Sequence, residues 1–235
     1  MIAIRKAPSG PAFVLASLLA AYPDDTFQEH VALLLENEEL DERIAPSLPE
    51  VRAKVGDWFG NAAGIDDLRS EYIDLFDHGR QVNSLYETEY GRERALVKGT
   101  ELVDIAAFYR AFGLETGADG MRPEMLDHVA VELEYYAILV LKSELLSEKN
   151  DVTGMEVVLD ARKKFLKAHL GRFVGAIGER PGVIGSPFYS AVFRYCKELV
   201  LEECERLVVE VEPESLISEK VENPDVTCGG SVGCV

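Results

Sequence analysis

Apolar residues recur at spacings of three and four along most of this chain, and that spacing limits what it can fold into. The clearest stripe consists of Leu126, Val129, Leu133, Tyr136, Ala137 and Val140. Residues so spaced lie on one face of an α-helix. No segment alternates apolar and polar residues convincingly, as a half-buried strand would. The sequence therefore predicts an all-α fold, a single helical-bundle domain of about seven to nine helices.

Breakers and capping residues divide this pattern into helices. The predicted helices lie at about 11–22, after Asp24 or Asp25, after the capping box at 47–50, at 65–76, at 93–112, from 123 through the central stripe, after Asn150, and after Ser186-Pro187. We expect the helix at 11–22 to belong to the mature fold and not to a signal peptide, because no A-x-A spacing follows it.

We expect residues 1–206 to form the helical domain. Its glycine-rich segment 113–122 is a possible hinge, so the sequence allows either a monomer or a dimer that exchanges helical halves. Residues 207–235 form an acidic tail that we expect to be partly flexible. Cys228 and Cys234 lie in this tail; they are too few to complete a tetrahedral metal site, and no role is assigned to them.

Composition excludes several classes of function. The 235 residues are 47% hydrophobic, which suits a globular protein. Their formal net charge is −18, and a chain this acidic with no basic patch is not expected to bind nucleic acid. No apolar run reaches the ~18 residues of a membrane span, so no stable membrane insertion is expected. Four cysteines, of which Cys196 and Cys204 fit buried helix positions, favour a reducing, cytoplasmic compartment.

Polar residues interrupt the central helix, which the pattern predicts to open at Pro123. Asp127 and His128 are expected in its second turn, and Glu132 follows His128 by four residues, so these two share a helix face. The simplest interpretation is a surface His–Glu pair, or an acid favoured by the helix dipole. The alternative is a functional site.

Familiar catalytic and metal-binding patterns are missing from the sequence. There is no Walker loop, His-Glu-x-x-His, Cys-x-x-Cys or Gly-x-Ser-x-Gly, and no histidine has a glutamate three residues before it. No metal or cofactor of its own is therefore expected. A helical metal-dependent hydrolase that uses His128, Glu132 and a third group remains the enzymatic alternative.

Residues 78–91 have no clear period and are predicted to form an ordered loop, where recognition residues concentrate. Tyr86 and Tyr90 either close the core beneath the loop, with their hydroxyls reaching water, or line a groove. Glu87 and Glu89 would stand at the rim of such a groove, which would suit an amphipathic peptide with basic residues. The physical arguments leave these two interpretations even.

Three stretches, taken in order, resemble one protein family. They are Tyr72-x-x-Leu75-Phe76-x-x-Gly79, then Leu85-Tyr86-Glu87-Thr88-Glu89-Tyr90, and then Asp127-His128-x-x-x-Glu132-Leu133-Glu134-Tyr135. Leu18-Leu19-x-x-Tyr22-Pro23-Asp24 and Lys164-Phe165-Leu166-x-x-His169-Leu170 add to the likeness. Together they resemble the TorD/DmsD and NarJ (nitrate reductase delta-subunit) chaperones, over roughly residues 13–201.

The resemblance implies an all-helical, non-enzymatic protein. It would bind the apo catalytic subunit of a molybdopterin oxidoreductase at an N-terminal or twin-arginine leader segment, and keep that subunit competent for insertion of the molybdenum cofactor. It leaves the particular client open. A permanent accessory subunit of the oxidoreductase is a further alternative.

The resemblance also suggests which residues would meet the client. The family's aspartate–histidine pair falls on Asp127 and His128, and its Tyr-Glu loop on Tyr86 and Glu87. We expect these four and Tyr90 to be contact residues. Glu132 is expected to orient His128. Tyr72 and Phe76 are expected to support the groove from beneath, and Tyr135 completes the predicted set.

Overall fold

The computed structural model of the protein describes residues 7–60, 64–80, 82–90, 94–114 and 126–212. These residues contain ten α-helices and no strand, which confirms the all-α prediction. The helices are α1 (Gly10–Ala20), α2 (Phe27–Leu35), α3 (Leu48–Phe59), α4 (Gly64–Tyr72), α5 (Arg94–Ala111), α6 (Val129–Glu148), α7 (Val152–Ala168), α8 (Leu170–Gly178), α9 (Pro181–Gly185) and α10 (Pro187–Leu207). A π-helical turn at Ile73–His78 extends α4, and Glu87–Glu89 form a short 3₁₀ turn.

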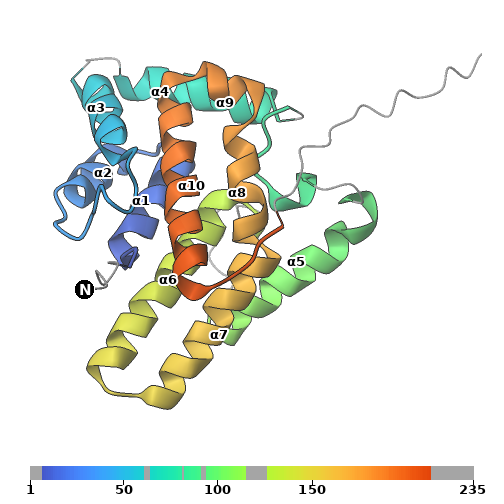
Figure 1. The fold of residues 1–235 in the computed structure, drawn as a ribbon. Helices are drawn as coiled ribbons and strands as arrows, with labels where there is room; N and C mark the ends of the chain where they lie inside the picture. The colour runs from blue at the N-terminus through green and yellow to red at the C-terminus, as the bar shows by residue number, and fades with distance from the viewer. Residues whose placement is uncertain (1–6, 61–63, 81, 91–93, 115–125, 213–235) are drawn as a thin grey trace, which may run out of the picture.

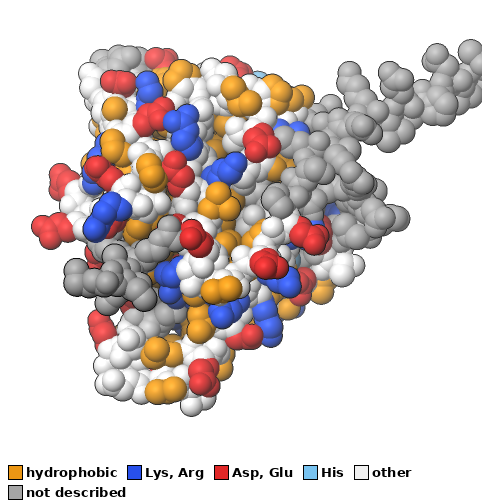
Figure 2. Space-filling model, viewed as in Figure 1, with side chains coloured by type: hydrophobic (Ala, Val, Ile, Leu, Met, Phe, Trp, Pro, Cys, Tyr) orange, Lys and Arg blue, Asp and Glu red, His pale blue; other side chains and the backbone are white. Residues whose placement is uncertain are grey.

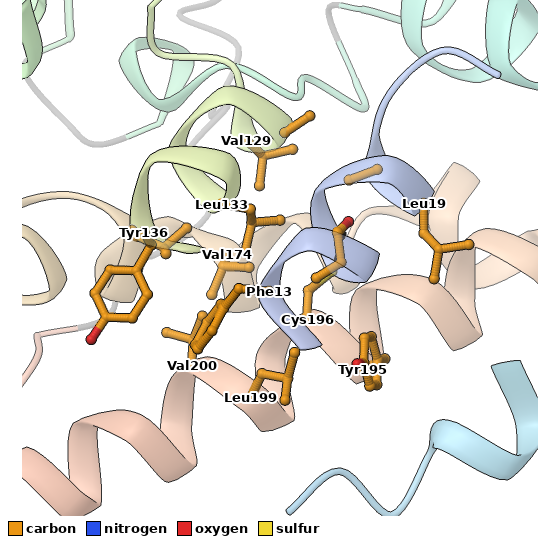
Figure 3. Packing of buried hydrophobic residues seen from close by; sticks show 14 of the residues in the cluster. Phe13, Leu19, Val129, Leu133, Tyr136, Val174, Tyr195, Cys196, Leu199 and Val200 are labelled. Carbon is orange, nitrogen blue, oxygen red and sulfur yellow. Dashed lines mark hydrogen bonds between the residues drawn. The ribbon is translucent and has the colours of Figure 1, made fainter. Parts of the chain in front are cut away.

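Helix α1 lies at the centre of the bundle. It packs along α6 on one side and α10 on another, while α7 runs beside α6 and α8 beside α10 (Figure 1). The ring of Phe13 in α1 lies 4.8 Å from the ring of Tyr136 in α6. Figure 3 shows Leu133, Leu199 and Val200 converging on the same region from α6 and α10. Burial of this kind stabilises by about 25 cal/mol per Å² of apolar surface removed from water.

The predicted stripe of the central helix is part of this core. Val129, Leu133, Tyr136, Ala137 and Val140 are all buried. Leu126 is only partly buried and precedes the helix. Cys196 and Cys204 are buried free cysteines, as their helical positions indicated.

Helix boundaries differ from the predictions at three places. The central helix begins at Val129, so Asp127 and His128 precede it and do not lie in its second turn; Pro123 lies outside the described residues. The long helix predicted after Asn150 is divided at His169, whose backbone departs from helical geometry. Pro181–Gly185 form the short helix α9, which is not among the predicted helices.

The predicted capping box at 47–50 does not form. The Ser47 side chain makes no bond to the first turn of α3, although α3 does begin there. Instead the backbone N–H and the hydroxyl of Ser47 both donate to Glu198 Oε2 in α10, at 2.8 and 2.6 Å. A tertiary partner has replaced the local one, which the sequence spacing could not reveal.

Two predicted segments lie mainly outside the described residues. The possible hinge at 113–122 begins just after α5, where Gly113 has a φ of +78° that a residue with a Cβ rarely adopts. Residues 115–125 are not described, and neither are 213–235 with Cys228 and Cys234. The described part of the tail begins where α10 ends at Leu207.

Charged and hydrophobic side chains are mixed on the surface of the protein. Figure 2 shows acidic side chains spread among basic and hydrophobic ones on one face. Among the described residues, none of the helices is long and apolar enough to cross a bilayer.

A buried ionic network ties α6, α7 and α10 together. Glu203 is fully buried and pairs with Arg162, and it accepts hydrogen bonds from the Tyr136 hydroxyl (2.7 Å) and from Arg206 Nε (2.8 Å). Burial alone would raise the pKa of Glu203, but these bonds and the two guanidinium charges outweigh it, so the pKa is lowered. The carboxylate is therefore ionised and satisfied inside the core.

Replacing this carboxylate should cost much more stability than replacing an exposed one on the same helix. Glu203→Gln leaves the buried Arg162 charge without its counter-ion, and we expect the free energy of unfolding to fall by about 3 kcal/mol. Glu205→Gln, on the exposed face of α10, should change it by less than about 0.5 kcal/mol. Urea denaturation of both variants measures the difference, and equal losses would contradict it.

Candidate functional site

The predicted loop and the residues before the central helix lie side by side. The Val129 N–H donates to the Leu85 carbonyl (2.9 Å), and the Glu87 N–H donates to the Asp127 carbonyl (2.8 Å). These bonds form an isolated antiparallel bridge between Tyr86 and His128. Stretches about 40 residues apart in sequence are thus joined through their backbones. We call this contact the loop–helix bridge.

The Asp127 side chain strengthens the bridge. Its Oδ2 accepts hydrogen bonds from the Thr88 hydroxyl (2.5 Å) and the Thr88 backbone N–H (3.2 Å). Asp127 is fully buried and Thr88 nearly so. Because hydrogen bonds are electrostatically stronger in the protein interior than in water, Asp127 fixes the 3₁₀ turn that carries Glu87 and Glu89.

His128 is the N-cap of α6. Its Nδ1 accepts a hydrogen bond from the Ala130 N–H (3.2 Å), so the proton lies on Nε2, which donates to the Tyr72 hydroxyl (3.4 Å). The Tyr86 ring meets the imidazole edge-on at 5.1 Å. Burial, and to a lesser extent the charge of Arg80, lower the pKa of His128 to about 4. His128 is therefore neutral at physiological pH.

Glu132 does not orient His128. Neither of its carboxyl oxygens makes a hydrogen bond of normal geometry with a described residue, and the Ala130 N–H and Tyr72 hold the imidazole instead. Glu132 is fully buried, so the interpretation as an exposed His–Glu pair is also wrong. Burial raises the pKa of Glu132 well above its usual range, and the adjacent Glu87 carboxylate raises it further. Glu132 is therefore protonated at neutral pH.

A histidine that was not among the predicted site residues holds the other side of the loop. His169, at the break between α7 and α8, has Nδ1 3.1 Å from Glu87 Oε2 and Nε2 3.1 Å from Asp104 Oδ2. Burial opposes the charged form of His169, but these two carboxylates outweigh it and the pKa is raised. The charged ring therefore links the loop to α5. Only the likeness of residues 164–170 to the family pointed toward His169.

The predicted site residues separate into one surface residue and several buried ones. Tyr86 is half-buried; the other eight, Tyr72, Phe76, Glu87, Tyr90, Asp127, His128, Glu132 and Tyr135, are all at most 5% exposed. The Tyr90 hydroxyl donates to the Ser84 carbonyl (2.5 Å) and does not reach water, so Tyr90 closes the core beneath the loop. Tyr135 lies apart from the bridge, 4.7 Å from the Phe165 ring.

Three residues that contact this framework face solvent or nearly so. Arg80 is exposed and lies over the Tyr86 ring, 4.2 Å from its centroid. Tyr22 is 40% exposed and packs edge-on against Tyr72 at 5.5 Å. Tyr72 and His128 lie beneath and connect the two tyrosines. We call Tyr22, Arg80 and Tyr86 the Tyr22–Tyr86 surface.

The geometry does not favour the metal-hydrolase alternative. Glu132 is protonated and makes no hydrogen bond to His128, so the pair that the alternative requires is not formed. In the part of the chain that the structure describes, no three His, Cys, Asp or Glu side chains are grouped so as to hold a metal ion.

Comparison with known families identifies the chain. Residues 37–178, more than half of its length, match the family described as nitrate reductase delta subunit. The chain belongs to the nitrate reductase delta subunit family. This confirms the resemblance drawn from the sequence, and the match spans the bridge, α5 and His169. No curated protein sequence matches the chain.

The family gives this protein its general role. Its members are maturation chaperones of molybdenum enzymes and are not catalytic, so this delta-subunit homologue is a molybdoenzyme maturation chaperone. Membership also implies that its partner is the catalytic subunit of a molybdoenzyme.

The neutral state of His128 predicts a pH dependence of stability. The folded pKa of about 4 lies below the usual ~6.5, so the unfolded chain binds a proton first as the pH falls. The stability from neutral His128 is complete above pH ~6.5 and should fall by about 2 kcal/mol between pH 7 and pH 5. His128→Gln removes this contribution.

The measurement is the free energy of unfolding of both proteins at the two pH values. Other titrating groups, such as His169 and Glu132, are common to both and cancel in the difference. An equal pH dependence in wild type and His128→Gln would contradict a buried neutral imidazole.

Proposed function

We propose that this protein is a client-specific chaperone that binds the apo catalytic subunit of a molybdopterin oxidoreductase. It binds an N-terminal or twin-arginine leader segment of that subunit, in the cytoplasm, and keeps the subunit competent for insertion of the molybdenum cofactor. The observation that carries the proposal is the loop–helix bridge, which brings the family's two characteristic stretches together. Family membership supplies the class of client.

The client would contact the Tyr22–Tyr86 surface. Tyrosine and arginine are, with tryptophan, the residues enriched among those that dominate the energy of protein interfaces, because they bury large area and retain a polar end. Tyr86 and Arg80 already stack on each other, so little side-chain freedom remains to be lost on binding. The overall charge of −18 would speed the encounter with a basic segment, and salt would weaken that attraction.

The buried residues of the site would act by positioning this surface. Asp127 holds the loop through Thr88, His128 supports the Tyr86 ring, and Glu87 is held by His169. We therefore assign Asp127, His128 and Glu87 to the support of Tyr86 and not to direct contact. Tyr72 and Phe76 would support the surface from beneath, and their ring centroids lie 5.0 Å apart.

Removing the stacked pair of Tyr86 and Arg80 should weaken client binding without unfolding the chaperone. Tyr86→Ala with Arg80→Ala deletes the stacked side chains, and we expect at least a tenfold loss of affinity for the apo catalytic subunit encoded nearby. Arg43→Ala, another exposed arginine, is the matched control and should bind as wild type. Co-purification and titration calorimetry measure both.

The outcomes also distinguish this proposal from the remaining alternative, a permanent accessory subunit of the oxidoreductase. If wild type fails to bind any apo molybdopterin subunit, the proposed function is wrong. If the chain is instead found in the purified active oxidoreductase, it is a permanent accessory subunit. If the double variant binds normally, the function stands and the surface is wrongly placed.

A further inference from the structure

One imidazole ring connects three separate parts of the chain. His169 lies where α7 ends and α8 begins, and only 3% of its side chain is exposed. Its Nδ1 lies 3.1 Å from Oε2 of Glu87, in the loop that carries Tyr86. Its Nε2 lies 3.1 Å from Oδ2 of Asp104 in α5, which runs beside the α7–α8 junction (Figure 1). We call Glu87, His169 and Asp104 the histidine link.

The geometry of the histidine link requires a charged imidazole. An ionised carboxylate can only accept hydrogen bonds, so each ring nitrogen must carry a proton to bind its carboxylate. In the neutral ring, one nitrogen would instead point a lone pair at a carboxylate. The uncharged rings of Phe108 in α5 and Phe165 in α7 pack against the imidazole, at 5.6 and 5.2 Å. Burial opposes the charge, but Glu87 and Asp104 outweigh it and raise the pKa of His169.

The two carboxylates of the link differ in their access to water. The Glu87 side chain is 4% exposed, and the protonated Glu132 carboxyl faces it from α6. The Asp104 side chain is 57% exposed, so it can turn toward water. If His169 loses a proton, the remaining N–H should stay with Glu87, because a buried acceptor that loses its partner costs more than an exposed one. The contact that opens is therefore the one between Nε2 and Asp104.

Further charged groups around the link come from α5, α8 and the start of α6. Glu101 of α5 and the charged His169 attract each other, and Glu101 is also attracted by Arg172 of α8. Asp127 and Glu132, at the start of α6, both interact electrostatically with Glu101. The acids Glu101 and Asp127 favour a charged ring and Arg172 opposes it, while the protonated Glu132 adds no charge. These groups surround the link but do not bind either ring nitrogen.

We propose that His169 is a positioning residue whose charged ring ties the loop of the loop–helix bridge to α5, and whose deprotonation at Nε2 releases Asp104. The proton passes to solvent, which reaches the exposed Asp104 side chain. The bridge holds the loop through its backbone, and the histidine link holds it through the Glu87 side chain. Among the described residues, the other ion pair between this loop and α5 joins Glu89 to Lys98, and it is partly exposed and therefore weak. Deprotonation should thus loosen α5 against the loop.

The first test follows the ring by NMR in the full-length chain with ¹⁵N-labelled histidine, where His169→Gln identifies the signal. Because the folded pKa of His169 is raised, the link should be complete below the usual ~6.5 and open as the pH rises through the folded pKa. Both ring nitrogens should therefore be protonated at about pH 6. Asp104→Asn should lower the midpoint, and Asp160→Asn, at an exposed acid on α7 that pairs with Lys164, should not. A neutral ring at about pH 6, or an unchanged midpoint in Asp104→Asn, overturns the proposal.

The second test measures whether α5 follows the ring. Amide hydrogen exchange is recorded at Ile105 and Ala106, two buried residues of α5, on either side of the His169 midpoint. In wild type their protection factors should fall about threefold or more as the ring becomes neutral. Asp104→Asn, which changes an exposed side chain and spares the core, should show the lower protection already below the midpoint and no further fall. Equal falls in the two proteins overturn the proposal.

The consequence for client binding rests on the proposed function. Affinity of wild type for the apo catalytic subunit should fall as the pH rises through the His169 midpoint. In His169→Gln it should be lower at the start and should not show this fall, and equal pH dependence in both proteins overturns a role of the link in binding. The two NMR tests need no client, so their failure removes the link and leaves the chaperone role standing. Absence of any binding by wild type removes the proposed function, and the NMR tests then still decide whether the link exists.

Discussion

The loop–helix bridge is the contact on which the proposed binding surface depends. Two backbone hydrogen bonds join the loop at Leu85–Glu87 to the residues that enter α6. The α6 helix is in turn held by the central core through α1 and by the buried network at Glu203. An otherwise irregular loop is thereby attached to the buried core of the bundle. Without the bridge, Tyr86 would have no fixed place above His128.

Burial suits the polar residues of the candidate site to structural support and not to acid–base chemistry. His128 is neutral, Glu132 is protonated, and Asp127 Oδ2 accepts hydrogen bonds from Thr88. A general acid or base needs access to a substrate, and these three side chains are at most 2% exposed. They are suited to holding aromatic side chains in place, because buried polar contacts have strong directional preferences.

Periodicity was enough to predict the fold class and most core positions. Val129, Leu133 and Tyr136 are buried because helical spacing places them on one face. The predicted start of α6 was wrong for two reasons. Pro123 is compatible with a first helical turn. The bridge that joins the loop to Asp127 is a tertiary contact, so it does not affect the local spacing of apolar residues. Ser47 shows the same limit, since its partner Glu198 lies 151 residues away.

The candidate site was predicted only in part, for a similar reason. The two stretches that carry Tyr86 and His128 were recognised from family likeness, and the structure places them together. Their burial, the role of His169 and the exposed partners Arg80 and Tyr22 depend on packing between distant segments. Helical spacing reports which face of an element is apolar, but it does not report which polar side chain from another element will meet it.

The affinity of two threonine variants for the apo catalytic subunit tests the account most directly. Thr88→Val keeps the side-chain shape but removes the buried hydroxyl bond to Asp127, whereas Thr26→Val removes an exposed hydroxyl bond to Asp24. If the bridge positions the client surface, Thr88→Val should fold and yet bind the client at least fivefold more weakly, and Thr26→Val should bind as wild type. Wild-type affinity in a folded Thr88→Val protein would contradict the account.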